Sequence, residues 1–80
     1  MNATHTNQRI TAAAVRANLA RTYTTITEAA TELGISRSTL SRKANGHTPF
    51  KADEIRGLAD LMGIHPAELL GPDENLQEAA

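Results

Sequence analysis

The larger apolar residues of this chain recur at intervals of three and four positions, the spacing of one face of an α-helix. The strict alternation of apolar and polar residues that is typical of strands is absent. Glycine, proline and a run of threonines divide the repeats into five stretches. Helices are therefore expected over about residues 10–21, 25–33, 36–44, 52–62 and 66–70.

The ends of these stretches carry residues that cap helices. Thr25 and Glu28 have the spacing of a capping box, in which each side chain accepts a hydrogen bond from the backbone N–H of the other residue. Ser36 is a suitable N-cap for the third helix, and Pro66 suits the first position of the last one. Left-handed residues are expected to end the helices at Gly34, at Asn45–Gly46 and at Gly63.

These elements predict one compact all-α domain with a thin core. Of the 80 residues, 14 are alanine and only 18 are larger apolar residues. We expect a flexible, polar N-terminal arm over residues 1–8, the folded domain over residues 9–71 and a polar C-terminal tail over residues 72–80. Tyr23 and Phe50 are most simply residues of the core or its edge.

The segment from Ile26 to Asn45 meets the steric requirements of a helix-turn-helix. Two short helices that cross steeply need a small side chain where they nearly touch and a left-handed residue in the turn, and Ala30 and Gly34 supply these. Apolar residues at the inner corners complete the pattern, namely Leu33, Ile35 and Leu40.

The outer face of the predicted third helix is made of hydrogen-bonding residues without an acidic one. If Leu40 and Ala44 are buried, the opposite face carries Arg37, Ser38, Ser41, Arg42 and Asn45, with Ser36 at its tip. Arginine can donate two hydrogen bonds to guanine, and serine can bind bases or phosphates. This face is suited to duplex DNA.

Charge is distributed unevenly along the chain although the net charge is −1. Seven basic and two acidic residues precede Ala52, whereas one basic and seven acidic residues follow Lys51. This pattern favours a polyanion-binding face backed by an acidic one.

Other chemistries find little support in the composition. The chain has no cysteine, so disulfides and thiolate chemistry are excluded. The three histidines lack metal-ligand spacing, and Glu28 and Glu32 are best read as a solvated helix face. His65 is suited to capping the Pro66 helix. We expect no enzyme activity, cofactor, metal or small-molecule substrate, and no stretch resembles a membrane span or a signal peptide.

A family resemblance rests on two segments. Residues 34–42 read Gly-Ile-Ser-Arg-Ser-Thr-Leu-Ser-Arg, are followed by Asn45–Gly46, and resemble the recognition segment of the Cro and phage-repressor (Xre-type) helix-turn-helix family. Residues 58–70 are similar to the closing helices of that family. The resemblance implies a five-helix, lambda-repressor-like DNA-binding domain. It further implies base contacts from Ser36, Arg37, Ser38 and Arg42, and backbone contacts from Ser41, Asn45, His47, Thr48 and Lys51.

Three residues depart from the pattern of that family. Ile26 stands where many members carry a glutamine that touches a phosphate, and Ala44 stands where they often carry glutamate. Lys43 occupies a position that is usually apolar, so we expect its charge to reach outward to solvent or its corner to pack loosely.

The sequence thus predicts a cytoplasmic, sequence-specific transcriptional regulator, Cro-like or repressor-like and of phage, prophage or plasmid origin. Because one copy reads only a few base pairs, we expect a homodimer on a palindromic double-stranded operator. An antitoxin or protein-interaction module on the same fold is the alternative. Steep salt dependence of binding would favour DNA over a mainly apolar protein contact.

Overall fold

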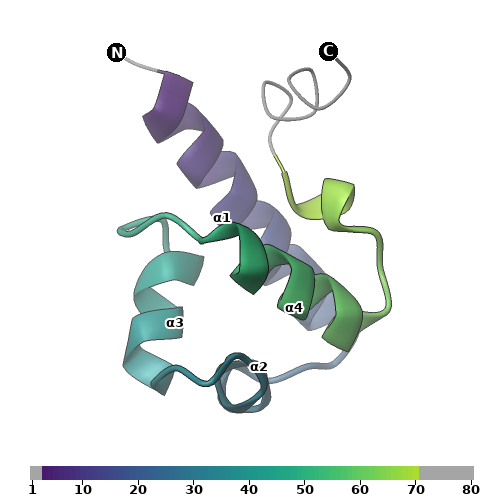
Figure 1. The fold of residues 1–80 in the computed structure, drawn as a ribbon. Helices are drawn as coiled ribbons and strands as arrows, with labels where there is room; N and C mark the ends of the chain where they lie inside the picture. Colours follow the sequence, from purple (N-terminus) through teal and green to yellow (C-terminus); the bar gives the residue numbers. More distant parts are fainter. Residues whose placement is uncertain (1–2, 71–80) are drawn as a thin grey trace.

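The computed structural model describes residues 3–70 of the chain, which form four α-helices and one short 3₁₀ helix (Figure 1). In chain order they are α1 (Ala3–Arg21), α2 (Ile26–Leu33), α3 (Arg37–Ala44), α4 (Ala52–Met62) and η1 (Pro66–Leu69). The predicted all-α class is confirmed. Helix α2 packs on α3 and α4, while α1 packs on α3 and η1.

The short fifth helix expected over residues 66–70 is present, but as a 3₁₀ helix rather than an α-helix. The backbone bonds at its two ends span three residues, from Glu68 N–H to the His65 carbonyl oxygen (3.0 Å) and from Leu70 N–H to the Ala67 carbonyl oxygen (3.3 Å). Four residues are too few for a ladder of α-helical bonds, so the tighter form is adopted. His65 caps it as expected, because its Nδ1 accepts the N–H of Ala67 at 3.0 Å.

Helix α1 begins at Ala3, seven residues before the expected start at Ile10. Residues 3–8, which we assigned to an arm, are therefore helical, and the predicted boundary is wrong. They have no apolar repeat that could reveal a helix. The side chain of Gln8 instead donates a hydrogen bond from Nε2 to the carbonyl oxygen of Gly46 at 3.1 Å, which ties this part of α1 to the loop after α3.

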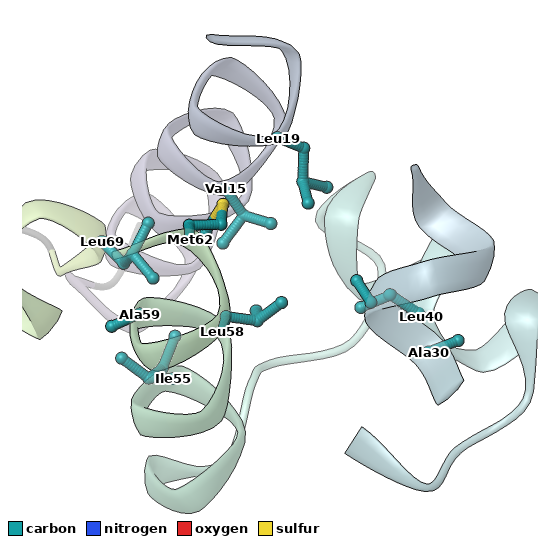
Figure 2. Close-up of a cluster of buried hydrophobic side chains, with 10 residues drawn as sticks. Val15, Leu19, Ala30, Leu40, Ile55, Leu58, Ala59, Met62 and Leu69 are labelled. Atoms are coloured by element: carbon teal, nitrogen blue, oxygen red, sulfur yellow. The ribbon is translucent and has the colours of Figure 1, made fainter. Parts of the chain in front are cut away.

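The core lies where α1, α4 and η1 meet the pair α2 and α3. Figure 2 shows Leu58 of α4 pointing toward Leu40 of α3, with Ala30 of α2 beside it. The buried apolar cluster contains Val15, Leu19, Ala29, Ala30, Leu40, Ile55, Leu58, Ala59, Met62 and Leu69. Because three of these ten are alanines, the core is as thin as the composition suggested.

Gly57 of α4 lies against the side chain of Leu33 of α2. A Cβ atom on Gly57 would lie 2.7 Å from Cδ2 of Leu33, so a larger residue would force that leucine to move. The sequence pattern did not single out this glycine.

Tyr23 is not a core residue, and that expectation is wrong. It is 92% exposed and has a φ of +56°. Its N–H bonds to the carbonyl oxygen of Ala20, and the N–H of Thr24 bonds to that of Leu19, which is the hydrogen-bond pattern of a Schellman cap at the end of α1. Tyr23 occupies the left-handed position of this cap, and its ring lies in solvent. Phe50, by contrast, is half-buried and packs against the core, as expected.

Candidate nucleic-acid interface

The capping box at the start of α2 is confirmed. The N–H of Glu28 donates to Oγ1 of Thr25 at 3.0 Å, and the N–H of Thr25 donates to Oε1 of Glu28 at 2.9 Å. These hydrogen bonds from Thr25 lower the pKa of the Glu28 carboxyl below its ordinary value. Glu28 therefore has a local structural role at the helix start.

The turn between α2 and α3 has the expected left-handed glycine. Gly34 has a φ of +70° and its N–H bonds to the carbonyl oxygen of Thr31, while the N–H of Ile35 bonds to that of Ala30. This second Schellman cap ends α2 within one residue, so α3 can start again after only Ile35 and Ser36. Ala30 is buried, at 3% exposure.

Ser36 caps α3 with its side chain. Its Oγ accepts the N–H of Thr39 at 3.1 Å and lies 2.8 Å from Oγ1 of Thr39. These two bonds hold the hydroxyl of Ser36 against its own helix. Its principal role in the free protein is therefore to begin the helix that carries the other candidate residues.

The two faces of α3 differ as the sequence predicted. Leu40 and Ala44 are buried, at 0% and 2% exposure. On the other side, Arg37, Ser38, Arg42 and Asn45 are exposed and Ser41 is half-buried. Within residues 8–70, neither Arg37 nor Arg42 forms an ion pair with a carboxylate.

An open hollow lies between the start of α2 and the outer face of α3. Its lining comprises Ile26, Ser36, Arg37, Ser38, Ser41 and Arg42. Five of the nine candidate residues are therefore brought together on one surface. Ile26, which cannot donate a hydrogen bond, forms the apolar edge of the hollow and also packs against the core.

The remaining candidates follow α3 directly. Asn45 has a φ of −95°, so the left-handed position expected for Asn45–Gly46 belongs to Gly46 alone, at +83°. Beyond it, His47 and Lys51 are exposed and Thr48 is half-buried. Lys51 is the residue before α4, and its side chain makes no capping bond.

Lys43 contradicts the expectation that its charge reaches solvent. The residue is 6% exposed, and its Nζ lies 2.6 Å and 2.7 Å from the two carboxylate oxygens of Glu54 on α4. Glu54 is also buried, at 9% exposure. The buried charge is paired, so the packing of this corner does not require it to reach water.

Burial raises the pKa of the Glu54 carboxyl, but the hydrogen bonds from Lys43 and Lys51 and the charges of both lysines outweigh it. The net effect lowers the pKa of Glu54 below its ordinary value. Glu54 therefore stays ionised beside Lys43 at neutral pH.

Sequence reasoning missed two donors on α1 that bind the C-terminal end of α3 and the residues after it. Arg16 donates from its guanidinium to the carbonyl oxygen of Ala44, and Gln8 donates to that of Gly46. Both residues lie on or next to the α1 face that carries Ala12 and Val15, which are buried. Their helical spacing with these two residues was the available signal.

The described part of the chain was also searched for metal sites and for membrane-spanning helices. In residues 8–70 no group of three or more histidine, aspartate or glutamate residues is arranged to hold a metal ion. No helix in this part of the chain is both long and apolar enough to cross a membrane.

The tight turn after α2, the capped α3 and its exposed polar face define a helix-turn-helix protein. Comparison with protein families agrees, since residues 6–70 match the model described as a helix-turn-helix domain. The chain therefore belongs to the helix-turn-helix domain family, and this membership points to DNA as its partner. Neither the curated proteins nor the solved structures gave a match.

Proposed function

We propose that this protein is a sequence-specific, double-stranded DNA-binding transcriptional regulator that reads an operator with α3. The observation that carries the proposal is the two-sided character of this helix. Leu40 and Ala44 anchor it in the core, while Arg37, Ser38 and Arg42 stay exposed on the other side. Exposed guanidinium groups without carboxylate partners are free to bind guanine edges or phosphates.

Base and backbone contacts divide along the chain in this proposal. Arg37, Ser38 and Arg42 select bases, with Ser36 at the tip of the same helix. Ser41 on α3 sets the register through phosphates together with four residues that follow the helix, namely Asn45, His47, Thr48 and Lys51. The protein acts without a cofactor and in the cytoplasm, where its operator lies.

The resemblance to Cro and phage repressors supports a repressor that blocks polymerase by occupying the operator. It also supports an origin in a phage, prophage or plasmid. A homodimer on two half-sites about one helical turn apart follows from the few base pairs that one α3 helix can span. Sedimentation of the protein with its operator should then show two chains per duplex, and one chain per duplex would contradict the dimer.

The proposal is tested by selecting bound sequences from random duplex DNA and then measuring variants on the selected operator. Arg37→Ala should cost on the order of 1–3 kcal/mol of binding free energy and relax the preference at one base pair. Arg56→Ala is the matched control, since Arg56 is an exposed arginine on α4. If no sequence is enriched, or if Arg37→Ala binds like the control with unchanged preference, the assignment of α3 fails.

A further inference from the structure

A charged contact lies directly behind the recognition surface. Lys43 belongs to the last turn of α3, next to Arg42, but it projects from the buried side of the helix. Its ammonium group is within 2.6 Å and 2.7 Å of the two oxygens of Glu54, in the first turn of α4. The pair therefore joins α3 to α4.

The same carboxylate also holds the start of α4. Oε1 of Glu54 accepts the backbone N–H of Lys51 at 2.8 Å. Lys43 precedes the loop from Asn45 to Lys51, and Lys51 ends it. Glu54 thus fixes both ends of the loop whose side chains are proposed to bind phosphates.

Helix α1 binds the same region from another side. Arg16 donates to the carbonyl oxygen of Ala44, and Gln8 donates to that of Gly46 at 3.1 Å. The buried apolar residues of α3 are only Leu40 and Ala44. The C-terminal end of α3 is therefore held by polar contacts as well as by the buried Ala44, and polar contacts have stricter geometry than apolar packing.

A buried ion pair is weak evidence for stability. Removing the two charges from water has a large cost, and replacing such a pair by uncharged groups of similar volume is often neutral or stabilising. What the pair supplies here is a fixed distance and direction between α3, α4 and the loop between them.

We propose that Lys43 and Glu54 are positioning residues for DNA recognition, which hold the end of α3 and the 45–51 loop in one geometry. In that geometry Arg42 meets base edges while His47, Thr48 and Lys51 meet phosphates of the same half-site. This inference rests on the proposed function. It assigns a role to two residues that do not themselves touch DNA.

The test is the double variant Lys43→Met/Glu54→Gln, which removes both charges at similar volume and keeps an acceptor for the N–H of Lys51. Affinity for the selected operator should fall about tenfold or more. The ratio between the affinity for this operator and the affinity for duplexes with one changed base pair should become smaller. The stability control is Leu69→Val, a buried position on η1, which packs on α1 and α4. It should weaken the fold and leave the discrimination unchanged.

Each result decides between the two proposals. A folded double variant that binds and discriminates like the wild type overturns the positioning role alone. A wild-type chain that binds no duplex overturns the proposed function and the positioning role with it. Hydrogen exchange of the wild type needs no variant to fold: the amide of Lys51 should be protected, and exchange at the rate of an open loop would overturn the role.

Discussion

Tyr23 alone among the non-glycine residues of the described chain has a positive φ, and its side chain is almost fully in solvent. A left-handed backbone brings the Cβ of an L-residue close to the following carbonyl oxygen, at a cost of roughly 1–2 kcal/mol. No burial of the ring offsets this cost. The residue is therefore a site of stored strain at the end of α1.

Replacing Tyr23 by glycine should stabilise the protein. Glycine removes the free-energy cost of the left-handed backbone. This gain exceeds the free-energy cost of the extra entropy that glycine gives the unfolded chain, so we expect the free energy of unfolding to rise by up to about 1 kcal/mol. Urea unfolding followed by circular dichroism measures it. Tyr23→Ala, which keeps the strain, should stay within about 0.5 kcal/mol of the wild type. A glycine variant less stable than the alanine variant would contradict the strain.

The ionisation of Glu54 predicts how stability depends on pH. Because its pKa is lowered in the folded protein, Glu54 contributes stability above the ordinary glutamate pKa of about 4.3. This contribution is lost as the pH falls below that value and through the lower pKa of the folded state.

Glu54→Gln should accordingly flatten the acid side of a plot of unfolding free energy against pH. Glu28→Gln should flatten it as well, since the pKa of Glu28 is lowered in the same direction. Urea unfolding at a series of pH values between about 3 and 6 measures both slopes. If the profile of Glu54→Gln is as steep as that of the wild type, the ionisation of Glu54 does not contribute to the pH dependence of stability.

At the scale of elements, the tight crossing of α2 and α3 depends on small side chains. Ala30 is 3% exposed and belongs to the same buried cluster as Leu40 (Figure 2). A well-packed site of this kind has no room for added methyl groups.

Ala30→Val should destabilise the domain by about 1–3 kcal/mol, because two added methyl groups must be accommodated by shifting α2 or α3. Thr31→Val is the control, since Thr31 is the exposed neighbour and the change conserves its shape. Thermal melts compare the two variants. Equal melting temperatures would mean that the crossing is looser than the structure shows.

The elements that the sequence predicted are those whose signals are local. Thr25 with Glu28, Gly34 and Ser36 mark helix ends through contacts within three or four residues, and all three signals were correct. Helix α1 lacked such a signal at its start. Its first turns have no apolar repeat, and Gln8 is tied to Gly46, 38 positions away in the chain.

The candidate site, too, could be predicted only where its signals are local. The division of α3 into a buried and an exposed face followed from periodicity alone. The pairing of Lys43 with Glu54 did not, because it joins residues on two helices and depends on how those helices pack. Without knowledge of this partner, the sequence indicated that Lys43 either reaches solvent or leaves its corner loosely packed. Tyr23 was misjudged because an aromatic residue rarely occupies a left-handed cap.

At the scale of the whole molecule, the two elements proposed to read DNA, α2 and α3, lie on one side. Figure 1 shows α2 and α3 away from η1. The exposed acidic residues Asp53, Asp60 and Glu68 belong to α4 and η1, while α2 carries the exposed Glu28 and Glu32. The exposed basic residues Arg37 and Arg42 of α3 and Lys51 of the following loop belong to the proposed operator-binding surface. This arrangement orients the protein on a polyanion.

Salt dependence reports how many phosphates the molecule neutralises. Lys51→Ala should weaken binding to all sequences about equally and reduce the slope of log affinity against log salt by about 0.9. Fluorescence anisotropy over a salt series gives both quantities. Arg56→Ala, on α4, should leave the slope unchanged. If the slope for Lys51→Ala equals that of the wild type, Lys51 does not contact a DNA phosphate.

The most direct test of the account is a backbone NMR titration of the protein with its selected duplex. Amide signals from Ser36 to Lys51 should shift strongly on binding, while those around Arg56, Asp60 and Glu68 should change little. Shifts concentrated on the acidic face of α4 and η1, with the α3 signals unmoved, would contradict the claim that α3 reads DNA.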